Sequence, residues 1–313
     1  MEWVILFFSS IILGGFSGYI GKKLSILDNP NNVKIHSFPI PRTGGVGIFL
    51  SFILGIYLFK STLDISFMEF FFLSIIFLIG FIDDLISILP KIKFFLEIVL
   101  SILLSMFNPG KFIPFSLLNI LFSVFYLVGS INALNEIDGM DGLAGGIAFI
   151  SCLFLSYWFK ELSLIVAIAC LGFLIWNFYP AKVFMGDGGS LFLGAFIGLM
   201  SLKALNMNPS FSTLIFLIFL YIVPIYDSAL TIIRRIINKK SIFKPDLGHF
   251  YNKLYNLMKN YVFTVILIYI FAITFGVLGF FLKDLPGFSS ITIGLIIWFL
   301  LIFIGYKLGF MKE

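Results

Sequence analysis

The chain has 313 residues, of which 60% are hydrophobic and only 12% charged, and its mean hydropathy is +1.09. These values exclude an ordinary water-soluble domain and indicate that lipid is the main solvent. The net charge of +5 is modest. Its meaning depends on the side of the bilayer on which the positive residues lie, and no nucleic-acid partner is expected.

Apolar stretches long enough to cross a bilayer as helices recur between short polar breaks. We therefore predict one all-α integral membrane domain over residues 1–313, a polytopic bundle of about eleven transmembrane helices. The predicted spans are 2–21, 44–60, 67–87, 94–108, 115–134, 143–159, 162–180, 190–206, 211–233, 261–282 and 288–307. The fourth is short because Pro109 and Gly110 end it early, which is compatible with a partial crossing.

The lysines and arginines assign an orientation to this bundle. When successive spans alternate in direction, all but five of the 21 Lys and Arg residues fall on one side; the exceptions are Lys60, Lys111, Lys160, Lys203 and Lys283. By the positive-inside rule the rich side is cytoplasmic, so we expect the N-terminus outside and the C-terminus inside. Seven of the 16 acids also fall at cytoplasmic span ends or loops: Asp83, Asp84, Glu136, Asp138, Asp141, Asp187 and Asp246.

Asp83 and Asp84 form an adjacent acidic pair at the end of the third span. Two neighbouring carboxylates near a bilayer edge repel each other, and a divalent cation or a nearby lysine would relieve the repulsion. Lys91 and Lys93 follow closely. The alternative interpretation is therefore a charged helix end that is neutralised by its own loop.

The segment from Asn132 to Leu143 contains two Asp-Gly pairs, at Asp138 and Asp141, and two asparagines, Asn132 and Asn135. Asp-Gly pairs turn sharply and present carboxylate oxygens beside backbone amides. A plain interhelical turn would need only one such pair. The pattern therefore favours a polar cradle.

A glycine-rich segment, Phe184 to Ser190, precedes the eighth span. Gly186 allows close approach of the backbone, Ser190 can cap the helix, and exposed amides at a helix N-terminus attract phosphate. Asp187 stands beside them as a candidate metal ligand, and Asn177 lies just upstream. A glycine-rich turn without a ligand is the plainer alternative.

Two cytoplasmic loops add candidates for phosphate or sugar binding. Asp246 and His249 lie in the basic loop 234–260, and Arg42 precedes Gly44 and Gly45 in a proline-stiffened approach to the second span. An arginine fixed in this way can bind a phosphate through two hydrogen bonds. Ordinary positive-inside charge is the competing explanation for the basic residues.

These segments, in this order and on one side, resemble the polyprenyl-phosphate N-acetylhexosamine-1-phosphate transferases. The motifs that carry the resemblance are Pro41 to Gly45, Asp83-Asp84, the 132–141 segment and Phe184 to Asp187 with Ser190. The loop at His249 departs from the family pattern, because relatives commonly have several histidines there. This departure argues against the relative that uses UDP-MurNAc-pentapeptide.

The resemblance implies a UDP-sugar donor, a polyprenyl phosphate acceptor, Mg²⁺ or Mn²⁺ as the cofactor, release of UMP, and an inner-membrane location with the active site facing the cytoplasm. It implies metal binding by Asp187 with Asn135, and catalytic roles for Asp83, Asp84, Asp138 and Asp141. Substrate-binding roles are expected for the remaining candidates, Arg42, Lys93, Asn132, Asn177, Gly186, Ser190, Asp246 and His249.

Two rival functions remain open at this stage. An ion-coupled transporter would place acids near mid-span, a description that only Glu97 and Asp227 approach. A non-catalytic assembly protein would need no acidic set. Membrane lipids are expected partners, and a homodimer is a further possible one that the apolar faces neither specify nor exclude.

Overall fold

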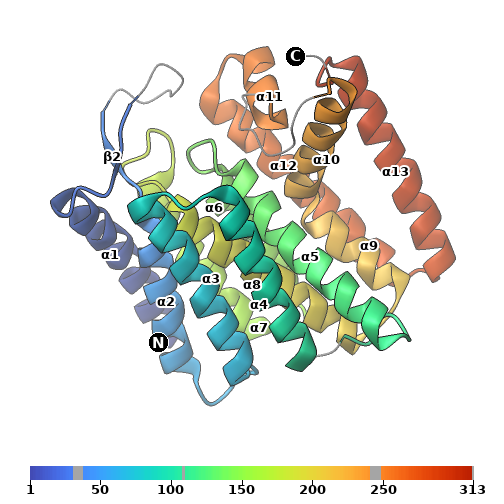
Figure 1. Cartoon of the computed structure of the whole chain (residues 1–313), viewed down its shortest axis with the longest axis horizontal. Coiled ribbons are helices and arrows are strands. Elements are labelled where there is room, and N and C mark those ends of the chain that lie inside the picture. Colours follow the sequence, from blue (N-terminus) through green and yellow to red (C-terminus); the bar gives the residue numbers. More distant parts are fainter. Residues whose placement is uncertain (31–37, 108–109, 240–247, 312–313) are drawn as a thin grey trace.

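The computed structural model describes residues 1–30, 38–107, 110–239 and 248–311. In the described part the chain is almost entirely helical (Figure 1). The elements are α1 (Glu2–Lys23), β1 (Leu27–Asp28), β2 (Ile40–Pro41), α2 (Gly44–Phe59), α3 (Phe67–Ile86), α4 (Pro90–Phe107), α5 (Ser116–Ile137), α6 (Leu143–Leu155), α7 (Lys160–Asn177), α8 (Gly186–Met207), α9 (Phe211–Leu220), α10 (Ile222–Ile237), α11 (Phe250–Met258), α12 (Tyr261–Leu282) and α13 (Gly287–Lys307).

The predicted all-α polytopic bundle is confirmed, and each of the eleven predicted spans corresponds to a helix or to a bent pair of helices. By length and apolarity alone, α1, α5, α7, α8, α12 and α13 can cross a membrane, and the bent pair α9 and α10 makes a seventh candidate. Helices α2 and α6 are apolar but shorter. Helices α3 and α4 are long enough, but each carries three charged residues.

Helix α8 lies at the centre of the bundle and packs mainly against α3 and α5. Of its most apolar stretch 89% is buried, whereas the corresponding value for the peripheral α13 is 17%. Close approach to α3 depends on Gly80, because a Cβ atom there would collide with the backbone of Asp187. Gly45 of α2 meets the backbone of Gly189 in the same way. The N-terminus of α8 is thereby held between two other helix ends.

The prediction of one continuous helix over 211–233 is wrong, because this segment forms two helices that meet at a bend. The helix is interrupted at Tyr221, and α9 and α10 meet at an angle of 83°. Pro224 explains the break, because it has no N–H to donate to the carbonyl of Leu220 and its ring crowds the preceding turn. The hydroxyl of Ser151 donates to that carbonyl instead, at 3.1 Å. The bend redirects α10 and with it Asp227.

Two helix starts also differ from the prediction. Helix α8 begins at Gly186 rather than at 190, so Ser190 lies inside the helix and does not cap it. Helix α4 begins at Pro90, a residue suited to the first helical position, rather than at 94. Lys91 and Lys93 therefore belong to a helical first turn, which fixes the direction in which Lys93 extends.

The start of α1 and the end of α13 lie at opposite ends of the bundle in Figure 1. The end of the bundle at which α13 ends also carries the short β1–β2 hairpin, in which Leu27 pairs with Pro41. Which end faces the cytoplasm stays a prediction from the distribution of charge. The division into a single domain is likewise a prediction from the sequence.

Candidate active site

The backbone amides at the start of α8 bind a carboxylate of the protein itself. The Asp187 N–H donates to Oδ1 of Asp84, and the Gly188 N–H donates to Oδ2, both at 3.0 Å. The predicted phosphate cradle is therefore filled by Asp84, whose side chain is only 2% exposed. The physical reason is that the first amides of a helix have no partner within the helix, and a nearby anion is stabilised there.

Two cations join the aspartates of α3 and α8. Arg42 Nε lies 3.1 Å from Asp84 Oδ1, and Arg42 Nη2 lies 3.8 Å from Asp187 Oδ1. Lys93 contacts Asp83 Oδ2 at 3.0 Å and also forms an ion pair with Asp187. The predicted residues Arg42, Lys93, Asp83, Asp84 and Asp187 thus converge, although they come from four separate segments. We call these five residues the inner cluster.

Asp83 and Asp84 have different environments although they are adjacent. Asp83 accepts a hydrogen bond from the Ile88 N–H at 2.5 Å, which holds the turn that follows α3. Its other oxygen faces Lys93, and its side chain is 13% exposed. Asp84 is almost fully enclosed, with both oxygens bound to groups of the protein. Asp83 is therefore better placed to meet a ligand, and Asp84 is better placed to hold α8.

Asp138 follows the last residue of α5 and lies beside the inner cluster. Burial raises its pKa well above the ordinary value, and the negative charges of Asp187 and Asp84 raise it further. The prediction that these acids lie near one another on one side of the bundle therefore agrees with the structure. An added positive charge at this place would be stabilised by several carboxylates at once.

The other members of the 132–143 segment contact neighbouring elements. Asn135 accepts a hydrogen bond from the Ser190 hydroxyl at 2.6 Å, which ties α5 to the first turns of α8. Asp141 accepts from the Ala181 N–H at 2.9 Å. Asn132 donates to Glu97 at 2.5 Å and to the Val128 carbonyl. These contacts place the segment against α8 and α4.

Asn177 connects two loops at the same end of the bundle. Its amide oxygen accepts from the Gly142 N–H at 3.0 Å, and its amide nitrogen donates to the Val183 carbonyl at 2.9 Å. The side chain is buried. The structure thus gives Asn177 a role in shaping the loops, and its predicted contact with substrate stays a prediction. Gly186 adopts a φ of +72°, which places the chain for the start of α8.

A second polar group, which the sequence did not indicate, pairs Asp227 with His249. Asp227 Oδ2 lies 2.7 Å from His249 Nδ1, and Asp227 Oδ1 accepts from the Phe250 N–H at 2.5 Å. Asp227 is completely buried. Its only signal in the sequence was a lone acid near mid-span. Asp246, predicted with His249, lies outside the described residues.

The acids of the inner cluster suit Mg²⁺ chemically, since Mg²⁺ prefers oxygen ligands. Among the residues that the structure describes, no three His, Cys, Asp or Glu side chains form a ready-made metal cage. Proteins commonly hold Mg²⁺ by one or two carboxylates together with the phosphates of a substrate. Asp187 and Asp83, which share Lys93, fit that kind of site.

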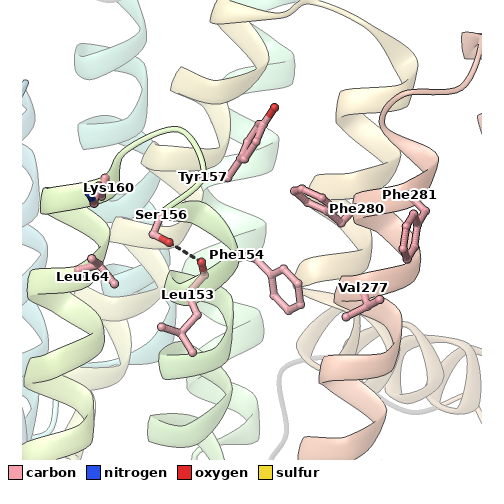
Figure 2. Close-up of a pocket in the computed structure, with 9 residues that line it drawn as sticks. All are labelled: Leu153, Phe154, Ser156, Tyr157, Lys160, Leu164, Val277, Phe280 and Phe281. Atoms are coloured by element: carbon pink, nitrogen blue, oxygen red, sulfur yellow. Dashed lines mark hydrogen bonds between the residues drawn. The ribbon is translucent and has the colours of Figure 1, made fainter.

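An apolar cavity of about 450 Å³ lies elsewhere, between the ends of α6 and α12 that are remote from the inner cluster (Figure 2). Leu153, Phe154, Val277, Phe280 and Phe281 are among its lining residues. Apart from Lys160 at one edge, it has no charged lining residue. The cavity therefore does not contribute to the candidate site.

Fold and site together define a polytopic membrane protein with a centre of clustered acids and bases at one end of its helices. Residues 66–205 match the family described as glycosyl transferase family 4. The chain is 31% identical to a probable undecaprenyl-phosphate N-acetylglucosaminyl 1-phosphate transferase of Bacillus subtilis (strain 168), over 96% of this chain and 88% of that protein. The chain belongs to glycosyl transferase family 4.

Two further relatives refine this picture. An undecaprenyl-phosphate alpha-N-acetylglucosaminyl 1-phosphate transferase of Thermotoga maritima is 32% identical over 89% of this chain and 88% of its own length. A phospho-N-acetylmuramoyl-pentapeptide-transferase of Dictyoglomus thermophilum is 34% identical, but over only 51% of this chain and 58% of its own. Similarity therefore extends along nearly the whole chain for the first kind of relative and along half for the second.

Proposed function

We propose that this protein transfers N-acetylglucosamine 1-phosphate from UDP-N-acetylglucosamine to a polyprenyl phosphate and releases UMP. The observation that carries the proposal is the convergence of Asp83, Asp187, Arg42 and Lys93 at one end of a membrane bundle. Two relatives that are similar over almost the entire chain are named as undecaprenyl-phosphate N-acetylglucosaminyl 1-phosphate transferases. The product would be the first lipid-linked intermediate of a cell-envelope glycan.

The reaction joins two anions, and its main obstacle is their mutual repulsion. An oxygen of the acceptor phosphate forms a bond to the phosphorus that carries the sugar, while the bond from that phosphorus to the bridging oxygen breaks and UMP leaves with the electron pair. Lys93 and Arg42 supply fixed positive charge where the phosphates must meet. Because a phosphate monoester is already ionised near neutral pH, direct attack ranks above a mechanism that needs Asp83 as a general base.

Mg²⁺ is the cofactor that this chemistry calls for, with Mn²⁺ as a substitute. Asp187 and Asp83 would hold the ion. When bound, it would neutralise pyrophosphate charge and stabilise the leaving UMP. Asp84 keeps the start of α8 in place through its two backbone hydrogen bonds, so that Asp187 stays directed toward Lys93.

The proposed reaction also fits the predicted location. The bundle is a multi-pass membrane protein, and the end that carries the inner cluster is the end that the positive-inside rule assigns to the cytoplasm. A nucleotide sugar made in the cytoplasm would reach this end from water, and a polyprenyl chain would reach it from the lipid. We therefore place the site at the cytoplasmic face of the plasma membrane.

The transporter alternative is not favoured. Of the two acids near mid-span, Glu97 bonds to Asn132 and Asp227 bonds to His249 and the Phe250 amide. These contacts come from neighbouring helices and tie the acids into the packing.

The direct test is transfer by the purified protein in detergent. Undecaprenyl phosphate and Mg²⁺ are supplied with UDP-N-acetylglucosamine, and UMP release is measured with and without EDTA. We expect UMP and lipid-linked sugar in equal amounts, lost with EDTA and restored by excess Mg²⁺. A panel of other UDP-sugars shows which sugar the protein prefers to transfer. The absence of UMP release with every donor would contradict the proposed function.

A further inference from the structure

Asp227 occupies a position that controls His249. It lies on α10, beyond the break at Tyr221, and its carboxylate is completely buried. His249 immediately precedes α11, and its side chain is 10% exposed. Asp227 Oδ2 approaches His249 Nδ1 to 2.7 Å. The second oxygen accepts the Phe250 N–H, so one carboxylate fixes both the ring and the start of the helix that follows it.

The identity of the partner sets the tautomer of the ring. A carboxylate accepts hydrogen bonds and cannot donate when ionised, so Nδ1 of His249 must carry the proton that it shares with Asp227. The lone pair of the neutral ring is then on Nε2, at the opposite edge. Thr231 Oγ1 lies 3.5 Å from Nδ1, too far to compete with the carboxylate.

His249 is also connected to the turn that contains Asp138. Its ring stacks on that of Tyr251, with centroids 5.4 Å apart and an interplanar angle of 11°. The Tyr251 hydroxyl donates to the Glu136 carbonyl at 3.3 Å, two residues before Asp138. The Ser228 hydroxyl, next to Asp227, donates to the Glu136 side chain at 2.7 Å. These contacts place the pair against the last turn of α5, two residues before Asp138.

We infer that Asp227 is a positioning residue that holds His249 as the Nδ1-protonated tautomer, so that Nε2 acts as a hydrogen-bond or proton acceptor during sugar-phosphate transfer. The functional half of this inference rests on the proposed function. The lone pair on Nε2 would accept a hydrogen bond from a hydroxyl or amide of the nucleotide sugar. It could instead take a proton from a polyprenyl phosphate that arrives protonated. Asp227 itself touches no reacting atom.

The Asp227→Asn variant distinguishes an effect on the tautomer of the His249 ring from an effect on side-chain packing. The carboxamide keeps the size of the side chain and can still accept the Phe250 N–H through its oxygen, but it then presents an NH₂ group to His249. Nδ1 would become the acceptor and the proton would move to Nε2. We expect kcat for transfer to fall by about 100-fold with little change in KM, as removal of a positioned acceptor predicts.

The tautomer is measured directly by ¹⁵N NMR of protein labelled at histidine, at about pH 8, above the ordinary histidine pKa near 6.5. The chain has two histidines, so a His36→Asn sample assigns the signals. Thr231→Val is the matched control, because it changes a neighbour of Nδ1 and leaves the carboxylate. We expect protonated Nδ1 in the wild type and in Thr231→Val, and protonated Nε2 in Asp227→Asn.

Three results would overturn the inference: a wild-type ring protonated on Nε2 or on both nitrogens, an unchanged tautomer in Asp227→Asn, or a reversed tautomer with normal kcat. The wild-type spectrum decides the first even where the variant fails to fold. If the wild type releases no UMP, the proposed function fails, while the spectra still report whether Asp227 sets the tautomer.

Discussion

The two ends of α8 carry ion pairs of opposite character. At the C-terminal end of α8, which we call the outer end, Lys203 Nζ lies 3.1 Å from Glu69 Oε2 and 3.5 Å from Asp64 Oδ2. Glu69 also closes a capping box with Ser66 at the start of α3. This arrangement completes a helix end and a helix contact. At the N-terminal end of α8, the inner end, the aspartates outnumber the two cations, and Asp138 adds a further, partly buried carboxyl group.

The difference shows which ion pairs stabilise the fold and which prepare a site. Lys203 pairs with acids at the start of α3 and in the loop before it. It therefore stabilises the packing of α3 against α8. An excess of buried carboxyl groups instead favours binding of further positive charge, at a cost to the protein without its ligand. The account therefore predicts that substitutions at the inner end impair transfer and that substitutions at the outer end impair stability.

Asp187→Asn should have the largest effect on transfer. The amide removes the negative charge that is proposed to hold Mg²⁺, and we expect the rate of UMP release to fall by at least about 100-fold. Insertion and the thermal unfolding midpoint should change little, because the backbone N–H of residue 187 still binds Asp84. Normal turnover in this variant would contradict the metal role.

Lys93→Met should have the next largest effect. It removes the cation between Asp83 and Asp187, and we expect kcat/KM to fall by about 30-fold, equivalent to about 2 kcal/mol. Lys91→Met is the matched control, because Lys91 is exposed and lies in the same first turn. Equal losses in the two variants would show that only the general positive charge of this loop matters.

Gly80→Ala tests how closely α3 and α8 must approach. The added Cβ would collide with the Asp187 backbone, so we expect unfolding to become easier by about 1–3 kcal/mol and transfer to fall with it. The comparison is Gly129→Ala in α5, where no atom lies within 4 Å of the added Cβ. That variant should be as stable as the wild type or slightly more stable. Thermal unfolding in detergent measures both.

Lys203→Met should have the smallest effect on transfer. Loss of the lysine leaves Glu69 buried beside the start of α3, and we expect a destabilisation of about 1–3 kcal/mol. The turnover of the folded fraction should match that of the wild type. A loss of turnover as large as that of Lys93→Met would remove the distinction between the two ends of α8.

The sequence predicted the fold well where hydropathy decides it. Polar breaks separate the apolar stretches, and the structure has a helix or a bent pair at every predicted span. The bend at Tyr221 was missed because apolar residues continue through 211–233, although Pro224 was visible. Helix α11 was missed because its nine residues are too few for an amphipathic pattern to stand out in a polar loop.

The site was predictable as a set of residues but not as a set of pairings. Charge and glycine patterns identified Asp83, Asp187 and Lys93, which converge. They could not show that the Asp84 carboxylate would accept the hydrogen bonds of the backbone amides at the start of α8, because any anion can accept them. The pairing of Asp227 with His249 depends on the bend in the ninth span, so no local pattern indicates it.

The most direct test of the account is the binding of Mn²⁺, observed by electron paramagnetic resonance in the presence of UDP-N-acetylglucosamine. We predict one tightly bound Mn²⁺ per chain in the wild type and in Lys203→Met, and none in Asp187→Asn. Unchanged binding of Mn²⁺ by Asp187→Asn would contradict the claim that the inner end of α8 holds the metal.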